Sequence, residues 1–112
     1  MLTDVPAEAQ INKVEVFGPV APITTFTTEE EAVAAANATE YGLVAYAWTQ
    51  DLARTMRLQE SLQAGMIGIN TGLVSNPAAP FGGVKASGFG REGGFEGIEE
   101  YVDTVYVALP AG

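Results

Sequence analysis

The chain has 112 residues, enough for one small domain with a hydrophobic core. Nearly half of its residues are apolar, so disorder is not expected, and a formal charge of −9 makes nucleic-acid backbones and anionic membranes poor partners. The chain contains no cysteine and no histidine. Disulfides, thiolate nucleophiles and cysteine-built metal sites are therefore excluded, and the commonest general base and metal ligand is missing.

The sequence predicts neither a membrane span nor a secretory signal. No apolar run approaches the roughly 20 residues of a membrane span. The first residues, Met1 to Asp4, show no basic region leading into an apolar stretch. We therefore expect a cytoplasmic protein that binds neither membranes nor nucleic acid.

The first half of the chain predicts alternating strands and helices. Residues 1–13 read as an extended lead-in, and the β-branched residues of 20–26 predict a strand. Thr28 followed three residues later by Glu31 forms a capping box, which starts a helix that Asn37 and Gly42 should end.

The same alternation continues through residue 70. Residues 43–48 predict a second strand, and a helix should begin near Asp51 and be capped at its end by Gly65. Residues 66–70 predict a third strand. The fold class is therefore α/β, with a β-α-β-α-β order and a parallel sheet covered by helices.

The last third of the chain has a different character. Residues 71–94 are rich in glycine and proline and predict a long loop, which in a compact domain is usually functional or part of an interface. Apolar residues at helical spacing predict a helix over 95–102. Residues 105–109 predict a final strand without a hairpin partner, so its partner must come from elsewhere.

The loop contains one literal G-x-G-x-x-G motif, at residues 88–93. A dinucleotide fingerprint needs a strand that runs directly into the glycines, and residues 84–87 do not predict one convincingly. We therefore expect a tight turn before a helix, with Arg91 and Glu92 in or near the first helical turn, rather than a phosphate site.

Two further segments carry side chains that suit a binding site. Glu15 and Phe17 would lie on one face of an extended stretch. There the carboxylate could accept hydrogen bonds from sugar hydroxyls, and the aromatic ring could stack on a flat ring. The alternative is an exposed glutamate and a core phenylalanine. Ser75 and Phe81 lie in the loop that follows the third strand. This loop could line a ligand site, because ligands gather at the carboxyl ends of parallel strands, or it could be an ordinary surface loop.

Six segments, in this order, resemble the aldehyde dehydrogenase superfamily from about Leu2 to Leu109. They are EVFGPV at 15–20, TEEEAVAAAN at 28–37, YGLVAY at 41–46, GINTG at 68–72, PFGGVKASGFGRE at 80–92 and GIEEY at 97–101. The stretch GINTGLVSNPAAPFGGVKASG is most similar to the succinate-semialdehyde dehydrogenase branch.

The resemblance implies that 1–112 is a single partial domain. Residues 1–101 would be the C-terminal part of the catalytic domain, and 102–112 would be an oligomerisation strand and tail. In such an enzyme a cysteine thiolate attacks the aldehyde, hydride passes to NAD or NADP, and a glutamate-activated water hydrolyses the thioester. Cysteine, base and dinucleotide-binding domain would all lie upstream, so we expect this chain to contain no catalytic residue and to bind no cofactor alone.

The resemblance also assigns roles to individual residues. Glu15 corresponds to the glutamate that binds the nicotinamide ribose, and Phe17 to the phenylalanine beside the nicotinamide ring. Phe81 corresponds to an aromatic of the aldehyde pocket, and Ser75 to a serine that holds the substrate carboxylate. Lys85 and Arg91 correspond to residues that brace the loop and the subunit contact.

Three functions follow from these expectations. The first is part of an aldehyde-oxidising enzyme that is silent alone and acts when joined to its upstream part. The second is a module that self-associates as a homo-oligomer or docks onto a relative through an exposed sheet edge. The third, a nucleotide-binding domain built on residues 88–93, has the weakest support.

Overall fold

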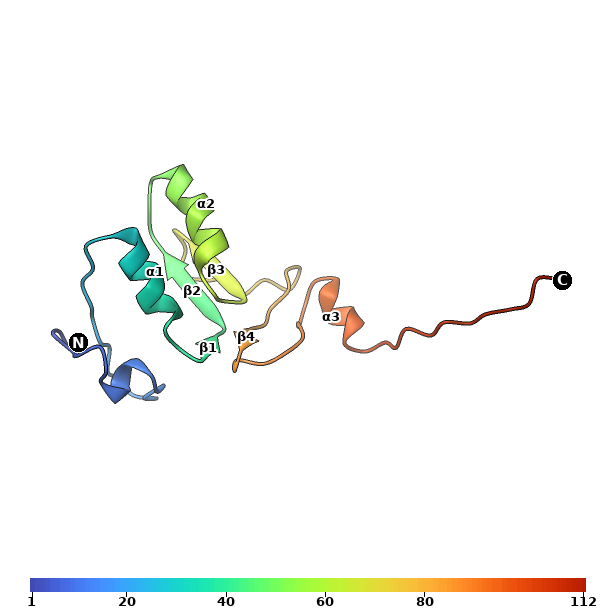
Figure 1. Ribbon diagram of the computed structural model, residues 1–112, viewed down its shortest axis with the longest axis horizontal. Helices are drawn as coiled ribbons and strands as arrows, with labels where there is room; N and C mark the ends of the chain where they lie inside the picture. Colours follow the sequence, from blue (N-terminus) through green and yellow to red (C-terminus); the bar gives the residue numbers. More distant parts are fainter.

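The computed structural model describes all 112 residues and contains short helices and strands joined by long irregular segments (Figure 1). In chain order these are η1 (Gln10–Asn12), α1 (Glu29–Asn37), β1 (Tyr41–Gly42), β2 (Val44–Ala47), α2 (Leu52–Ser61), β3 (Met66–Ile69), β4 (Val84–Lys85) and α3 (Glu96–Glu99).

A single β-α-β unit forms the centre of the molecule. Strands β2 and β3 pair in parallel, from Val44 opposite Met66 to Ala47 opposite Ile69, and α2 makes the crossover between them. The mixed helix-and-strand architecture agrees with the expected α/β class, although the parallel sheet has two strands rather than the three we expected.

Both long helices begin where the sequence predicts, because each has its own N-terminal cap. The Thr28 hydroxyl accepts a hydrogen bond from the Glu31 N–H at 3.2 Å, and the Glu31 carboxylate accepts one from the Thr28 N–H at 3.4 Å. At α2 the Asp51 carboxylate accepts from the Arg54 N–H at 3.1 Å. These bonds satisfy amide groups that otherwise have no partner within the helix.

The two helices lie beside each other and are joined by an ion pair. Glu29, in the first turn of α1, accepts hydrogen bonds from two arginines of α2. Arg57 is bidentate, at 2.6 and 2.7 Å, and Arg54 adds a third bond at 2.9 Å. This cluster joins the first turn of α1 to α2.

The predicted cap at Gly65 is wrong. Helix α2 already ends at Ser61, because Leu62 takes an extended conformation. Gly65 lies instead against the loop backbone, where a Cβ would overlap the carbonyl oxygen of Gly82. Its lack of a side chain lets the loop approach the start of β3.

The first predicted strand is also wrong. Residues 20–26 are extended, but only one isolated bridge forms, between Leu2 and Pro22. The lead-in contains the short helix η1, which the sequence did not predict. A strand needs a neighbour along its whole length to satisfy its backbone, and the first residues supply that neighbour at a single position.

The last third contains one more pairing than we expected, and it lacks the final strand. Strand β4 lies inside the predicted loop and pairs antiparallel with β1, with Tyr41 opposite Lys85. Helix α3 is shorter than predicted, and Arg91 and Glu92 precede it by several residues. The expected strand at 105–109 is absent: this segment runs alone, away from the rest of the molecule (Figure 1).

Very little of the chain is buried. Five residues are buried, and all except Met66 are glycines. The radius of gyration is 18.8 Å, against about 13 Å for a compact domain of this size. Large apolar side chains such as Phe17, Phe89 and Tyr106 are almost fully exposed. No helix is both long enough and apolar enough to cross a bilayer.

Candidate functional site

The loop that carries Ser75 and Phe81 leaves the end of β3 through Asn70. The Asn70 side chain accepts a hydrogen bond from the Thr49 N–H at 2.9 Å and donates one to the Thr49 carbonyl at 2.7 Å. Its backbone is left-handed, with φ of 55°, which asparagine tolerates better than most residues. The chain therefore turns sharply at Asn70 while its side chain continues the pairing with the segment after β2.

The far end of the same loop is fixed at Phe81. Phe81 and Glu92 exchange two backbone hydrogen bonds, at 2.7 and 2.8 Å. The Phe81 side chain remains partly exposed, at 36%, and lines a hollow of about 300 Å³ with Arg91 and Glu100. An aromatic ring on the wall of a hollow suits the apolar part of a small substrate.

Ser75 lies between these two anchors and is exposed. Its hydroxyl makes no hydrogen bond within the chain, so it is free to donate to a ligand. The preceding Val74 lies against β3, since a Cβ at Gly68 would be 3.0 Å from the Val74 Cγ1. Ser75 therefore follows a residue that is seated on the strand pair.

Glu15 lines a second hollow, of about 330 Å³, beside the end of α1 and the start of β2. Its carboxylate is exposed and has no hydrogen-bond partner within the chain, so it can accept bonds from sugar hydroxyls. The two hollows share Leu43 and Ser87 as wall residues, so Glu15 and Phe81 lie on neighbouring surfaces.

Phe17 does not lie with Glu15 on one face of a strand. The segment forms no strand, and Phe17 has a left-handed backbone, with φ of 48°. Its ring is 91% exposed, so the alternative of a core phenylalanine is also wrong. An exposed ring can cover a flat partner.

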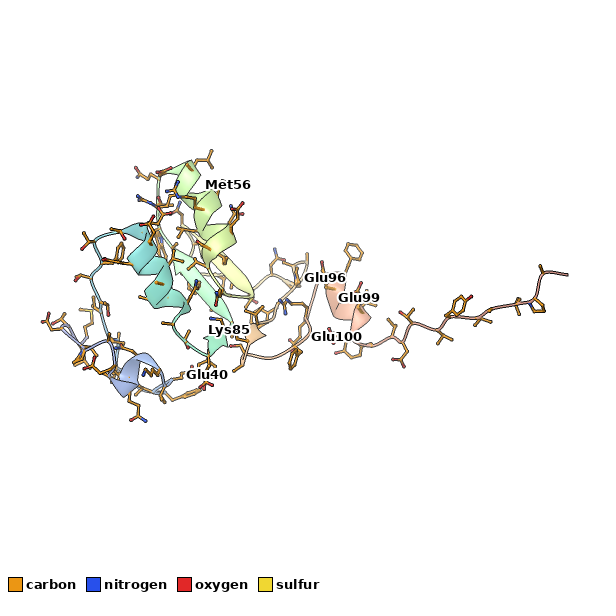
Figure 2. The ribbon with its side chains drawn as sticks, viewed as in Figure 1. Glu40, Met56, Lys85, Glu96, Glu99 and Glu100 are labelled. Carbon is orange, nitrogen blue, oxygen red and sulfur yellow. The ribbon has the colours of Figure 1, made fainter.

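Lys85 and Arg91 both donate hydrogen bonds to backbone carbonyl groups. The Lys85 ammonium donates to Asn37 at 3.0 Å and to Thr39 at 3.2 Å, at the C-terminal end of α1, and it is labelled in Figure 2. The Arg91 guanidinium donates to Gly83 at 2.8 Å and to Gly90 at 2.7 Å. Both side chains therefore brace the loop.

The glycines of 88–93 do not form a phosphate cradle. Their neighbouring amides already have protein partners: the Arg91 N–H donates to the Glu100 carboxylate at 3.3 Å, and the Glu92 N–H donates to the Phe81 carbonyl. Figure 2 labels Glu96 and Glu99 on α3 and Glu100 directly after it, and the negative charge of these three side chains would repel a phosphate. This geometry disfavours a dinucleotide site on the loop.

The residues present fit only one end of a dinucleotide. A free carboxylate at Glu15 suits the ribose next to the nicotinamide, and each hollow is too small for a whole dinucleotide. The site is therefore partial, with a free carboxylate, one aromatic wall and a free hydroxyl.

Sequence reasoning missed two residues that shape this region. Besides Asn70, Ser87 accepts a hydrogen bond from the Gly42 N–H at 2.9 Å, which joins the loop to β1. The position of Asn70 at the end of a predicted strand was a usable signal, because asparagine is enriched where the chain turns into a left-handed conformation. Ser87 offers no comparable signal.

The chain matches the model of the aldehyde dehydrogenase family over residues 1–107. It is 57% identical over 109 residues to a succinate-semialdehyde dehydrogenase of Paenarthrobacter nicotinovorans, covering 97% of this chain and 24% of that protein. It is 53% identical to a glutarate-semialdehyde dehydrogenase of Pseudomonas aeruginosa and 51% identical to the NADP(+) succinate-semialdehyde dehydrogenase of Escherichia coli K12, each again covering 97% of this chain and 23% of the relative.

Solved structures show the same relationship. An aldehyde dehydrogenase of Mycobacterium tuberculosis complexed with NAD+ superposes with a TM-score of 0.89 at 41% identity, over 98% of this chain and 23% of that one. An Escherichia coli NADP-dependent enzyme gives a TM-score of 0.87 at 53% identity, over 90% of this chain and 21% of that one. The chain spans about a quarter of the length of these relatives, and it belongs to the aldehyde dehydrogenase family.

Proposed function

We propose that this chain is the C-terminal part of an NAD(P)-dependent aldehyde dehydrogenase that oxidises an aldehyde with a second, anionic end. Succinic semialdehyde is the first candidate. The names of the relatives support this choice, since succinate and glutarate semialdehydes both carry a carboxylate at the end opposite the aldehyde. The observation that carries the proposal is the loop from Asn70 to Phe81, which is fixed at both ends and presents an unpaired Ser75 hydroxyl.

Each candidate residue then has a defined task. Ser75 donates a hydrogen bond to the distal carboxylate, and Phe81 packs against the carbon chain of the aldehyde. Glu15 accepts hydrogen bonds from the nicotinamide ribose, and Phe17 covers the ring. The cofactor supplies a hydride acceptor, while the nucleophile and the base come from the upstream part of the enzyme.

The test is a chimaera in which this chain replaces the aligned segment of the Escherichia coli relative. NADPH formation is followed with succinic semialdehyde and with butanal, which has the same carbon number and no carboxylate. Ser75→Ala should raise the KM for succinic semialdehyde about tenfold or more, because a hydrogen bond to a charged group contributes about 1.5–3 kcal/mol. The rate with butanal should change little.

Ser61→Ala is the matched control, since the Ser61 hydroxyl donates within α2 to the Arg57 carbonyl at 2.7 Å. It should leave the KM unchanged. Equal effects of Ser75→Ala on both aldehydes would refute the proposed contact. The 112-residue chain alone should form no NADPH or NADH with either aldehyde, and measurable turnover would show that the required groups do not lie upstream.

A second candidate function is self-association or docking through the end of the chain. The observation that favours it is the segment 102–112, which projects from the molecule with its apolar side chains exposed. An extended apolar segment of this kind can add a strand to another sheet, either in a second copy or in the upstream part of the enzyme.

A further inference from the structure

We infer that Asn70 is a positioning residue: its side-chain amide sets the course of the loop 71–81 and so places Ser75 for the anionic end of the substrate. The inference rests on the proposed function for Ser75. Asn70 itself contacts neither hollow, and it acts through the loop that begins beside it.

The Asn70 amide replaces a peptide group in the sheet. Its backbone N–H still donates to the Ala47 carbonyl at 2.8 Å, as the next step of the parallel pair. Its side chain then makes both bonds to Thr49, as a donor and as an acceptor. The pairing thus extends beyond the last residue of β3, although the backbone has already turned away from it.

Thr49 is itself held in place. Its hydroxyl accepts a hydrogen bond from the Asp51 N–H at 3.1 Å, and Asp51 caps the start of α2. The Asn70 side chain is therefore joined to a fixed turn rather than to a free strand end. This connection gives the loop a defined starting direction relative to the β-α-β unit.

Beyond Asn70 the loop contains mainly local bonds. Thr71 bonds with Leu73, and Asn76 closes a turn with Ala78 and Ala79, so each bond spans no more than three residues. Such turns fix the local shape of the loop, but they do not fix its direction relative to the β-α-β unit. The direction is set at Asn70, by the contact of Val74 with β3, by the Gly94 N–H that donates to the Pro77 carbonyl at 3.2 Å, and by the Phe81–Glu92 bridge at the far end.

The chimaera allows a test that separates the amide from the backbone turn. Asn70→Gly keeps access to the left-handed conformation and removes both bonds to Thr49. The measured quantity is the ratio of kcat/KM for succinic semialdehyde to kcat/KM for butanal. We expect Asn70→Gly to lower this ratio about tenfold, mainly through KM, because displacements of about 1 Å are costly in an enzyme site.

Asn37→Gly is the matched control. The Asn37 side chain also bridges two segments, since it donates to the Ser61 carbonyl at 2.8 Å and accepts from the Gln63 N–H at 2.8 Å. It lines the hollow of Glu15 but makes no hydrogen bond to residues 71–81. Both variants should lower the melting temperature of the chimaera. Only Asn70→Gly should lower the ratio, so a merely structural role predicts equal ratios in the two variants.

A second readout does not depend on the substrate. Amide hydrogen exchange of residues 71–76 should become faster in Asn70→Gly and stay unchanged in Asn37→Gly. If Ser75→Ala lowers the ratio and Asn70→Gly does not, the inference is overturned while the proposed function stands. If Ser75→Ala does not change the ratio, the proposed contact of Ser75 with the substrate is wrong, and so is the substrate part of the inference. If amide exchange of residues 71–76 is also unchanged in Asn70→Gly, Asn70 does not position the loop.

Discussion

Gly65 brings the loop onto the strand pair, and its role can be tested by adding a single methyl group. A Cβ at this position would overlap the carbonyl oxygen of Gly82 and lie 2.8 Å from the Gly83 Cα. Both neighbours are backbone atoms, so no side chain can rotate away. We expect Gly65→Ala to destabilise the chimaera by about 3 kcal/mol, at the upper end of typical overpacking costs, as measured by urea unfolding.

Gly72→Ala is the control, because a Cβ there would meet nothing within 4 Å. It should be neutral or slightly stabilising, since alanine restricts the unfolded chain. If the two variants were equally stable, the close approach of Gly65 to the loop would not exist in solution.

Residue chemistry could be predicted from the sequence better than residue placement. The free carboxylate of Glu15 and the free hydroxyl of Ser75 agree with the side-chain types that suggested binding, while their assigned contacts stay predictions. The shared face of Glu15 and Phe17 was wrong, because it assumed an alternation that requires strand pairing. The left-handed turn at Asn70 had a local signal, but no local pattern could reveal its two bonds to Thr49, which is 21 residues away.

The pair of helices α1 and α2 gives the chain its one clear pH-dependent contact. Hydrogen bonds from Arg57, and then from Arg54, lower the pKa of Glu29 from 4.5 to about 2. Because the folded pKa lies below the unfolded one, this contact stabilises the fold fully above pH 4.5 and loses its effect as the pH falls toward 2.

Substitution of Glu29 tests this contact between the helices. Glu29→Gln should lower the urea midpoint of the 112-residue chain at pH 7, followed by helical circular dichroism. The difference from the parent should shrink as the pH falls below 4.5, and added salt should also reduce it, because the two arginines are half-exposed.

Glu30→Gln provides the comparison, since Glu30 occupies the same helical turn and makes no ion pair. It should change the midpoint less than Glu29→Gln does at pH 7. A Glu29→Gln difference that persisted unchanged to pH 3 would mean that the stability does not come from the ionised carboxylate.

At the scale of elements, the starts of the helices could be predicted from the sequence, and the pairing of the strands could not. The starts of α1 and α2 follow from caps formed within four residues, so the sequence contains the whole explanation. Strands β1 and β4 are two residues long and pair across more than 40 positions, which leaves no periodicity to detect. Gly65 was taken for a helix cap because the contact that it makes, with Gly82, is not local.

The molecule as a whole buries little of its apolar surface. Nearly half of the residues are apolar, yet Met66 is the one apolar side chain that is buried. The chain spans about a quarter of the length of its relatives. A surface of this kind favours association.

The end of the chain is the segment best suited to such association. Val105, Val107 and Leu109 alternate, so they share one face of an extended backbone, and each is at least 70% exposed. Residues 102–112 have no backbone partner except at Val102, so their N–H and C=O groups are free to pair with another strand. We expect the purified 112-residue chain to form dimers or larger assemblies, measured by multi-angle light scattering.

Removal of residues 102–112 should shift this population toward monomer, because both the apolar face and the unpaired backbone are lost together. Leu73→Asp is the matched control: Leu73 is 73% exposed but lies in the loop, so its substitution should leave the assembly intact. The prediction would be wrong if the full 112-residue chain were monomeric. It would also be wrong if the truncated chain assembled as well as the full chain does. Loss of assembly in both variants would instead indicate nonspecific adhesion of the whole apolar surface, since two exposed segments far apart in the sequence would then contribute alike.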